Sequence, residues 1–209
     1  MKTTSRPMKT VLVKEYRVRA WFVIAISVLV AVGTASSAAA TPEKSHKQTT
    51  FEGLCSLEGT VTFDPGATFV PQQILTVDSH LQGTCNGILD GESVSDAPVS
   101  MHNAVQSSGS CLHAETLSPG PGTLTFADGR TIYYTFEFNW VGTDGVMRYY
   151  GQQSGLAVAH GTFRNPGVSG EGSKCASTGV TETGIVVNLA TESPLVSDCE
   201  TRHGRTRCR

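Results

Sequence analysis

The chain has 209 residues, 22 of them glycine, and a formal net charge of −2. The charge is unevenly placed, because residues 41–209 hold ten Lys and Arg against seventeen Asp and Glu, a formal −7. An acidic body argues against nucleic-acid binding by the folded part, since phosphate contacts need Lys and Arg. The length of this part suits one domain with a hydrophobic core of its own.

The first 40 residues are built like a secretory signal peptide. Basic residues up to Arg19 precede an uncharged, apolar run from Trp21 to Val32, and small residues with an Ala-x-Ala pattern lead to Ala40. The run is shorter than the roughly 20 residues that a membrane-spanning helix needs. We therefore expect cleavage near Ala40, secretion to the extracellular space and no stable membrane insertion afterwards. A retained N-terminal anchor is the alternative.

The rest of the chain predicts a single β domain. Residues 41–50 are polar and are expected to form a flexible leader, and residues 191–209 a basic C-terminal tail. Between them, residues 51–190 consist of short β-type runs separated by Gly, Pro and Asp-Gly, with no helical periodicity. The predicted fold is all-β: an antiparallel meander β-barrel of roughly eight to ten strands, with a two-sheet β-sandwich as the alternative.

The expected strands follow one another through short turns. Asp-Gly pairs at 90–91, 128–129 and 144–145 are strong hairpin signals, because glycine adopts a positive φ without steric cost. The predicted strands are Leu57–Phe63, Gln73–Thr84, Gly87–Leu89, Glu92–Gln106, Ser110–Thr116, Thr123–Ala127, Arg130–Trp140, Val146–Tyr150, Gly155–Phe163 and Val180–Ala190.

The hairpin around Asp128-Gly129 allows its register to be predicted. A two-residue loop would place threonines on the face of Ile132 and Tyr134. A three-residue loop, residues 127–129 with Gly129 left-handed, instead places Leu124 and Phe126 on that apolar face. We predict the three-residue loop, with Trp140, Phe138 and Tyr134 in the core and Glu137 on a face turned to solvent.

The strand around Gly155–Phe163 favours the barrel over the sandwich. Every second residue on one side of it is small, namely Gly155, Ala157, Ala159 and Gly161. A strand with such a face lets bulky residues of neighbouring strands lie across it, as tapered barrels require.

All six cysteines lie downstream of the signal segment, where an oxidising compartment makes disulfides their expected fate. Fifteen connectivities are possible, and strand order favours three bonds. Cys85–Cys111 would bridge the ends of a hairpin segment, Cys55–Cys175 would join the first and last strands, and Cys199–Cys208 would close a loop in the tail. The spacings match no zinc motif, so neither a metal site nor a cofactor is expected.

Candidate catalytic residues are few and carry weak signals. His102, His113 and Glu115 could meet across a hairpin and bind a metal or act as acid and base. His160, among small residues on a strand, is the histidine expected to be buried. For all four residues, an ordinary structural or surface role is the competing interpretation.

The C-terminal tail concentrates positive charge. A disulfide-closed loop carrying arginines could bind phosphates or carboxylates of a cell-envelope polymer, because guanidinium binds both in a bidentate way. A solvated tail that improves solubility is the alternative. The candidate binding residues are Arg202, Arg205, Arg207 and Arg209.

Several segments resemble small secreted β-rich proteins of high-GC Gram-positive bacteria. The resemblance rests on four motifs within 51–190: Cys-x-Leu-x-Gly-Thr-Val-Thr-Phe-Asp-Pro (55–65), Gly-Thr-Cys-Asn-Gly-x-Leu-Asp-Gly (83–91), Gly-Ser-Cys (109–111) and Gly-Thr-Leu-Thr-Phe-Ala-Asp-Gly-Arg (122–130). It implies export and a β domain, and it carries over no catalytic residue.

Three functions remain open from the sequence. We expect a secreted binding or cell-envelope-associated module that takes a small ligand or an anionic polymer. The alternatives are a small-molecule enzyme of the isomerase, cyclase or hydrolase type at the open end of the barrel, and a purely structural secreted protein. A polar lumen with a histidine and a carboxylate would favour the enzyme, and a lumen of Phe and Leu would favour the module.

Overall fold

The computed structural model describes residues 47–164, 172–202 and 205–208, so the expected signal peptide over residues 1–40 lies outside it. The β domain extends past its expected limits at both ends. Strand β1 (Lys47–Ala67) begins inside the expected leader, and β9 (Val180–Arg202) continues into the expected tail. These added segments pair with each other, Lys47 lying opposite Cys199. Residues 47–50 and 191–202 are therefore strand, although their polar composition suggested otherwise.

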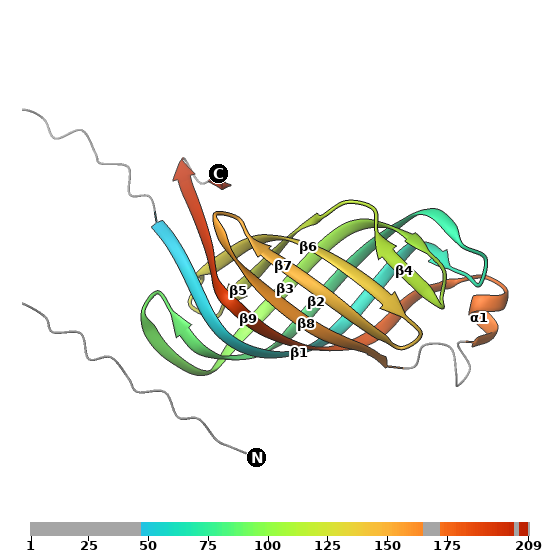
Figure 1. Ribbon diagram of the computed structural model, residues 1–209, viewed down its shortest axis with the longest axis horizontal. Coiled ribbons are helices and arrows are strands. Elements are labelled where there is room, and N and C mark those ends of the chain that lie inside the picture. The colour runs from blue at the N-terminus through green and yellow to red at the C-terminus, as the bar shows by residue number, and fades with distance from the viewer. Residues whose placement is uncertain (1–46, 165–171, 203–204, 209) are drawn as a thin grey trace, which may run out of the picture. The chain divides into compact units, whose positions relative to one another are not determined.

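The strands form a closed antiparallel ring, which confirms the predicted barrel (Figure 1). Neighbours along the chain pair with each other, except β4 with β5, and β1 also pairs with β9, which closes the ring. The remaining strands are β2 (Gln72–Leu89), β3 (Glu92–Gly109), β4 (His113–Thr116), β5 (Gly120–Phe126), β6 (Thr131–Val141), β7 (Asp144–Gly151), β8 (Ser154–Arg164) and β10 (Arg205–Cys208).

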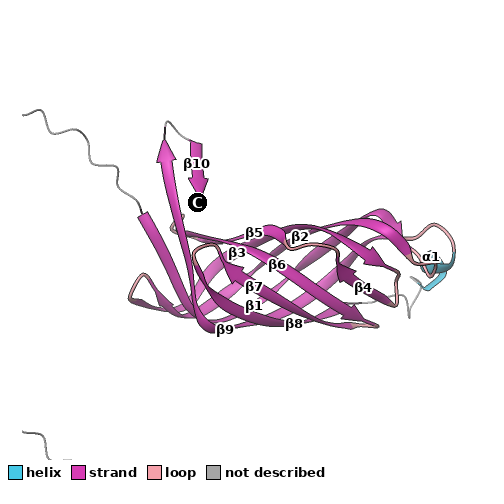
Figure 2. Ribbon diagram, turned by 45° about the horizontal axis from the view of Figure 1, so that its top comes forward, coloured by secondary structure: helices cyan, strands magenta, loops and turns pink. Residues whose placement is uncertain are grey.

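Two short strands share one place in the ring. Between β3 and β6, β4 pairs with both at one end of the barrel and β5 pairs with both at the other. The ring thus has eight positions, and β10 only extends β9 as a hairpin (Figure 2). The one described helix, α1 (Gly172–Ala176), lies before β9. Among the described helices, none is long and apolar enough to span a membrane.

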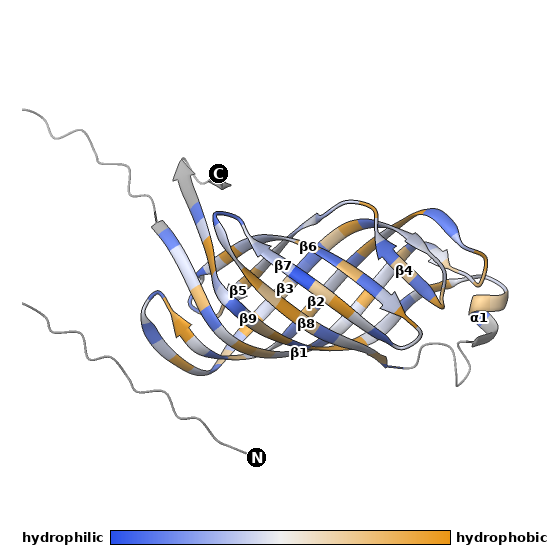
Figure 3. Cartoon of the chain, viewed as in Figure 1, coloured by the Kyte–Doolittle hydropathy of each residue, from blue (hydrophilic) through white to orange (hydrophobic). Residues whose placement is uncertain are grey.

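Alternation along the strands builds the core. Apolar side chains recur at every second residue, so that each strand shows alternating bands of hydropathy (Figure 3). On β8, Ala157 and Ala159 are fully buried, and Trp140 and Met147 pack over Gly161. The small face of this strand therefore accommodates large neighbours, as predicted.

Two of the three predicted Asp-Gly turns are confirmed. Asp90 and Gly91, both at positive φ, form a two-residue loop between Leu89 and Glu92. Leu124 pairs with Ile132, which is the register of the three-residue loop at 127–129. Gly129 has φ 88° there, and its N–H bonds the Phe126 carbonyl.

The third predicted turn, at Asp144-Gly145, is wrong. The loop is Gly142-Thr143, and Asp144 already pairs with Val141. Gly142 supplies the positive φ, at 62°. Gly145 serves packing instead, because a Cβ there would overlap the Trp140 ring.

Two of the predicted disulfides are also wrong. Cys55 bonds Cys85, its direct cross-strand partner on β2, and Cys111 bonds Cys175 in α1. The prediction paired Cys55 with Cys175 to close the barrel, but hydrogen bonding between β1 and β9 closes it without a covalent link. In the tail, Cys199 and Cys208 are paired in the β9–β10 register, and their side chains lie outside the described part of the chain.

Candidate functional site

The barrel encloses an apolar cavity of about 310 Å³. It lies at the end of the barrel that carries α1 and the loops at 68–71, 110–112 and 142–143, which we call the cavity end. Its wall comes from the inward residues of most strands, among them Val61 on β1, Val77 on β2 and Ile185 on β9. Because these residues alternate with outward ones, the strand pattern itself produces an apolar lining.

Aromatic side chains form one side of the cavity. The rings of Trp140 and Phe163 lie 3.7 Å apart between centroids, and Phe63 meets Phe163 edge-on at 6.1 Å. Phe136 and Phe138 on β6 also line the space. The sequence predicted Trp140 and Phe138 to be core residues, and the structure places both on the cavity wall.

The deeper part of the cavity contains a small polar group. Ser79 and Asn103 line the cavity and are 8% and 3% exposed. Asn103 donates an N–H to the Ser79 hydroxyl at 3.0 Å and accepts a hydrogen bond of 2.7 Å from the Tyr134 hydroxyl. Among the described residues, the second Asn103 N–H and the Ser79 hydroxyl proton have no acceptor. Two buried hydrogen-bond donors therefore face a mainly apolar space, which Ser110 and Thr183 also line.

Two tyrosines pack tightly beneath this group. Tyr134 and Tyr149 meet edge-on, with ring centroids 5.1 Å apart. Burial raises the pKa of each hydroxyl above its ordinary value, so both stay neutral across the physiological range. Tyr134 also donates to the Thr123 carbonyl at 3.1 Å. The polar pair therefore rests on two buried, uncharged tyrosines.

The Cys111–Cys175 disulfide organises the cavity end. Both cysteines line the cavity, and the Cys111 N–H bonds the Thr68 carbonyl at 2.8 Å. On the other side, the Phe69 N–H bonds the Cys175 carbonyl at 3.0 Å. The disulfide thus ties α1 to two loops, and the rim they form carries exposed apolar side chains, with Val70 72% and Leu112 58% exposed.

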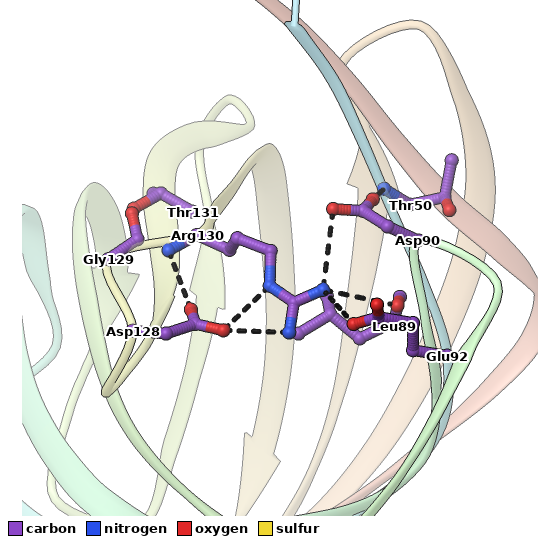
Figure 4. A network of polar contacts seen from close by, with 8 residues as sticks. All are labelled: Thr50, Leu89, Asp90, Glu92, Asp128, Gly129, Arg130 and Thr131. Atoms are coloured by element: carbon purple, nitrogen blue, oxygen red, sulfur yellow. Dashed lines mark hydrogen bonds and ion pairs between the residues drawn. The ribbon is translucent and has the colours of Figure 1, made fainter.

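The opposite end of the barrel is closed. Phe51 and Phe126 pack there with ring centroids 5.3 Å apart, and both are buried. Above them Arg130 joins two hairpins (Figure 4). Its guanidinium lies 2.7 Å from the Asp128 carboxylate and 3.2 Å from that of Glu92, and the bond to Asp128 is the main cause of its raised pKa.

None of the predicted catalytic residues lines the cavity. His102, His113, Glu115 and His160 all point outward and are exposed, so the expectation that His160 is buried is wrong. His113 lies level with Ser110, the residue after β3 and eight residues from His102, a separation of about 26 Å at 3.3 Å per residue. The expected cluster of His102, His113 and Glu115 therefore does not form. His102 instead contacts Asp78 and His80 on the outside of the barrel.

The remaining predictions concern the outer face of β6 and the tail. Glu137 faces outward as expected, and it accepts a hydrogen bond of 2.7 Å from the Tyr150 hydroxyl. In the tail, Arg202 pairs with Arg205 in the backbone register of β9 and β10. The side chains of the tail arginines, at 202, 205, 207 and 209, lie outside the described part of the chain.

Sequence reasoning missed Ser79 and Asn103. The sequence did not show whether these two polar residues point into the barrel or outward, because that depends on the register of β2 and β3. No family model, curated protein or solved structure matches this chain, so the cavity and its lining are the basis for assigning a function.

Proposed function

We propose that this protein is a secreted binding protein that holds a small, neutral, mainly apolar molecule inside the barrel. The observation that carries the proposal is the apolar cavity at the cavity end. Its volume of about 310 Å³ is at the small end of the range for ligand sites, about 300–1,000 Å³. Secretion is supported by the two disulfides, since such bonds persist in oxidising compartments.

The lining selects against charge. Among the described residues around the cavity there is no Asp, Glu, His, Lys or Arg. An ionised group would lose its hydration here without gaining a partner, which costs several kcal/mol. A neutral ligand is therefore favoured, and its apolar body would lie against Trp140 and Phe163.

The two free donors define a polar end for the ligand. A carbonyl, ester or ether oxygen placed near Ser79 and Asn103 would accept the hydrogen bonds that the protein leaves unused. Each such bond contributes about 0.5–1.5 kcal/mol, and more when it satisfies a buried donor. The ligand class is thus a compact apolar molecule with one hydrogen-bond-accepting oxygen.

An enzyme acting by acid–base chemistry is less well supported. Such chemistry needs a titratable group within about 3 Å of the reacting atom, and the candidate histidines point away from the lumen. The lumen has the apolar character that the sequence associated with a binding module.

Fluorescence provides the test. The chain has two tryptophans, and Trp21 lies in the segment expected to be cleaved, so Trp140 is the single donor in the secreted protein for energy transfer to N-phenyl-1-naphthylamine, a neutral apolar probe. We expect saturable transfer from Trp140 with one probe per chain. Ala114→Phe, which fills the cavity from β4, should weaken binding at least tenfold, whereas Ala104→Phe on the outer face of β3 should leave it unchanged. Equal binding by both variants would contradict the proposal.

A matched pair of competitors tests the ligand class. 2-Acetylnaphthalene and 2-ethylnaphthalene have similar shapes, but only the first has an acceptor oxygen. We expect the acetyl compound to displace the probe more tightly, and Ser79→Ala with Asn103→Ala to remove that preference. A preference unchanged in the double variant would place the oxygen elsewhere.

A further inference from the structure

Three side chains with metal-ligating atoms converge on the outer wall of the barrel. Asp78 and His80 lie on β2, and His102 lies on β3 directly opposite His80. One ligand atom from each falls within 4.8 Å of the others. This cluster lies outside the cavity and has no part in the proposed ligand site.

The geometry of the cluster is specific. Both histidines direct Nε2 at the same carboxylate, His80 at 2.9 Å from Oδ1 and His102 at 3.2 Å from each oxygen of Asp78. Two ligands bound to one Zn²⁺ at about 2.0–2.1 Å lie about 2.9–3.3 Å apart for angles between 90° and the tetrahedral value. The nitrogen–oxygen distances already match this spacing.

The two imidazole rings are stacked, with centroids 4.4 Å apart and an angle of 19° between their planes. Both rings therefore present Nε2 on the side of the Asp78 carboxylate. A metal ion would lie between these two nitrogen atoms and the carboxylate oxygens.

We propose that Asp78, His80 and His102 form a binding site for a divalent transition-metal ion, with Zn²⁺ as the representative case. Two imidazoles and one carboxylate are a donor set that such ions accept and that Ca²⁺ and Mg²⁺ do not favour. Three protein ligands leave at least one coordination position for water or an external ligand.

The surroundings leave that position accessible. His80 and His102 border an open hollow on the outer face, which also includes Thr60 and Thr123 of the neighbouring strands. The three side chains are 69%, 46% and 37% exposed for His80, His102 and Asp78. An ion can therefore reach the site from solvent without any rearrangement of the barrel.

The sequence did not indicate this metal site because its three ligands do not form a local motif. Asp-x-His on β2 places two ligands on one face of a strand, but the third comes from a residue 22 positions later. Only the pairing of β2 with β3, which sets His102 opposite His80, places this third ligand beside the other two.

The test measures metal binding on the intact protein. Zn²⁺ is titrated by calorimetry, and Co²⁺ is followed by its visible absorption, which reports coordination geometry. Single variants His80→Gln, His102→Gln and Asp78→Asn are compared with His113→Gln and His160→Gln, exposed histidines outside the cluster. Circular dichroism and urea unfolding establish that each variant is folded.

We expect one site per chain that His80→Gln and His102→Gln each weaken at least tenfold and that Asp78→Asn also weakens. The control variants should bind like the parent protein. Binding that survives in the His80→Gln, His102→Gln double variant would overturn the proposal, and so would the absence of binding to the parent protein. Neither result would bear on the cavity, because probe binding is measured separately.

Discussion

His80 on β2 and His102 on β3 lie directly opposite each other because β3 contains one extra residue. Near the Asp90-Gly91 turn, Gly87 pairs with Val94. Two residues farther from the turn on β2, Cys85 pairs with Ala97, which is three residues farther from it on β3. The extra residue is accommodated at Asp96, whose φ is 48°. Without it His102 would pair with Ser79 and turn inward. One β-bulge therefore places the histidine pair outside and the Asn103–Ser79 pair inside.

The bulge can be tested at Asp96. Asp96→Val should destabilise the fold by about 1–2 kcal/mol, because a β-branched residue is disfavoured at positive φ. Asp96→Gly removes the same carboxylate but accepts the backbone conformation, so it should be close to neutral. Urea unfolding of the two variants measures the difference. Equal destabilisation would mean that the Asp96 side chain, and not the backbone, holds the bulge.

Arg130 should contribute measurably to stability at the closed end. Its side chain is only 17% exposed and contacts Asp128, Glu92 and the Leu89 carbonyl. Arg130→Met should cost about 1–3 kcal/mol, the range for charge-assisted bonds in a partly buried site. Arg148→Met is the control, since Arg148 is 54% exposed and lies 3.9 Å from Glu137. A similar loss in both variants, measured by urea unfolding, would contradict this role.

The two described disulfides should have separable effects. Removing Cys111–Cys175 or Cys55–Cys85 with paired alanines should cost about 4 kcal/mol in each case, from the entropy of loops of 64 and 30 residues. Only the first bond lines the cavity and holds its rim. Probe affinity should therefore fall in the Cys111→Ala, Cys175→Ala variant and persist in the other, provided that both are folded. Equal probe affinities in the two variants would show that the Cys111–Cys175 bond has no role in binding.

Stability should decline in alkali. Burial raises the pKa of Tyr149 above its ordinary value near 10, so the unfolded chain loses this proton first as the pH rises. The contribution of Tyr149 is complete below pH 10 and falls by about 1.4 kcal/mol per pH unit above it. Tyr149→Phe should reduce the slope of unfolding free energy against pH by that amount. An unchanged slope between pH 10 and 11 would contradict the assigned burial.

Local sequence patterns predicted the fold well. The site depends on long-range strand pairing, which the sequence did not predict. Alternation around Trp140 and the loop at 127–129 identified strands, faces and one register, because these depend on neighbours in sequence. The disulfide prediction was wrong because Cys55 is directly opposite Cys85 in a register that sequence spacing does not reveal. The prediction for His160 was wrong because its face of β8 also carries Leu156 and Val158, so composition could not say which face is inside.

A crystal structure of the protein with N-phenyl-1-naphthylamine tests the central claim most directly. We predict that the probe lies inside the barrel, with its rings against Trp140 and Phe163. A probe bound only on the outer surface or on the exposed rim, with the cavity filled by shifted side chains, would contradict the proposal that this barrel is a binding protein for small apolar molecules.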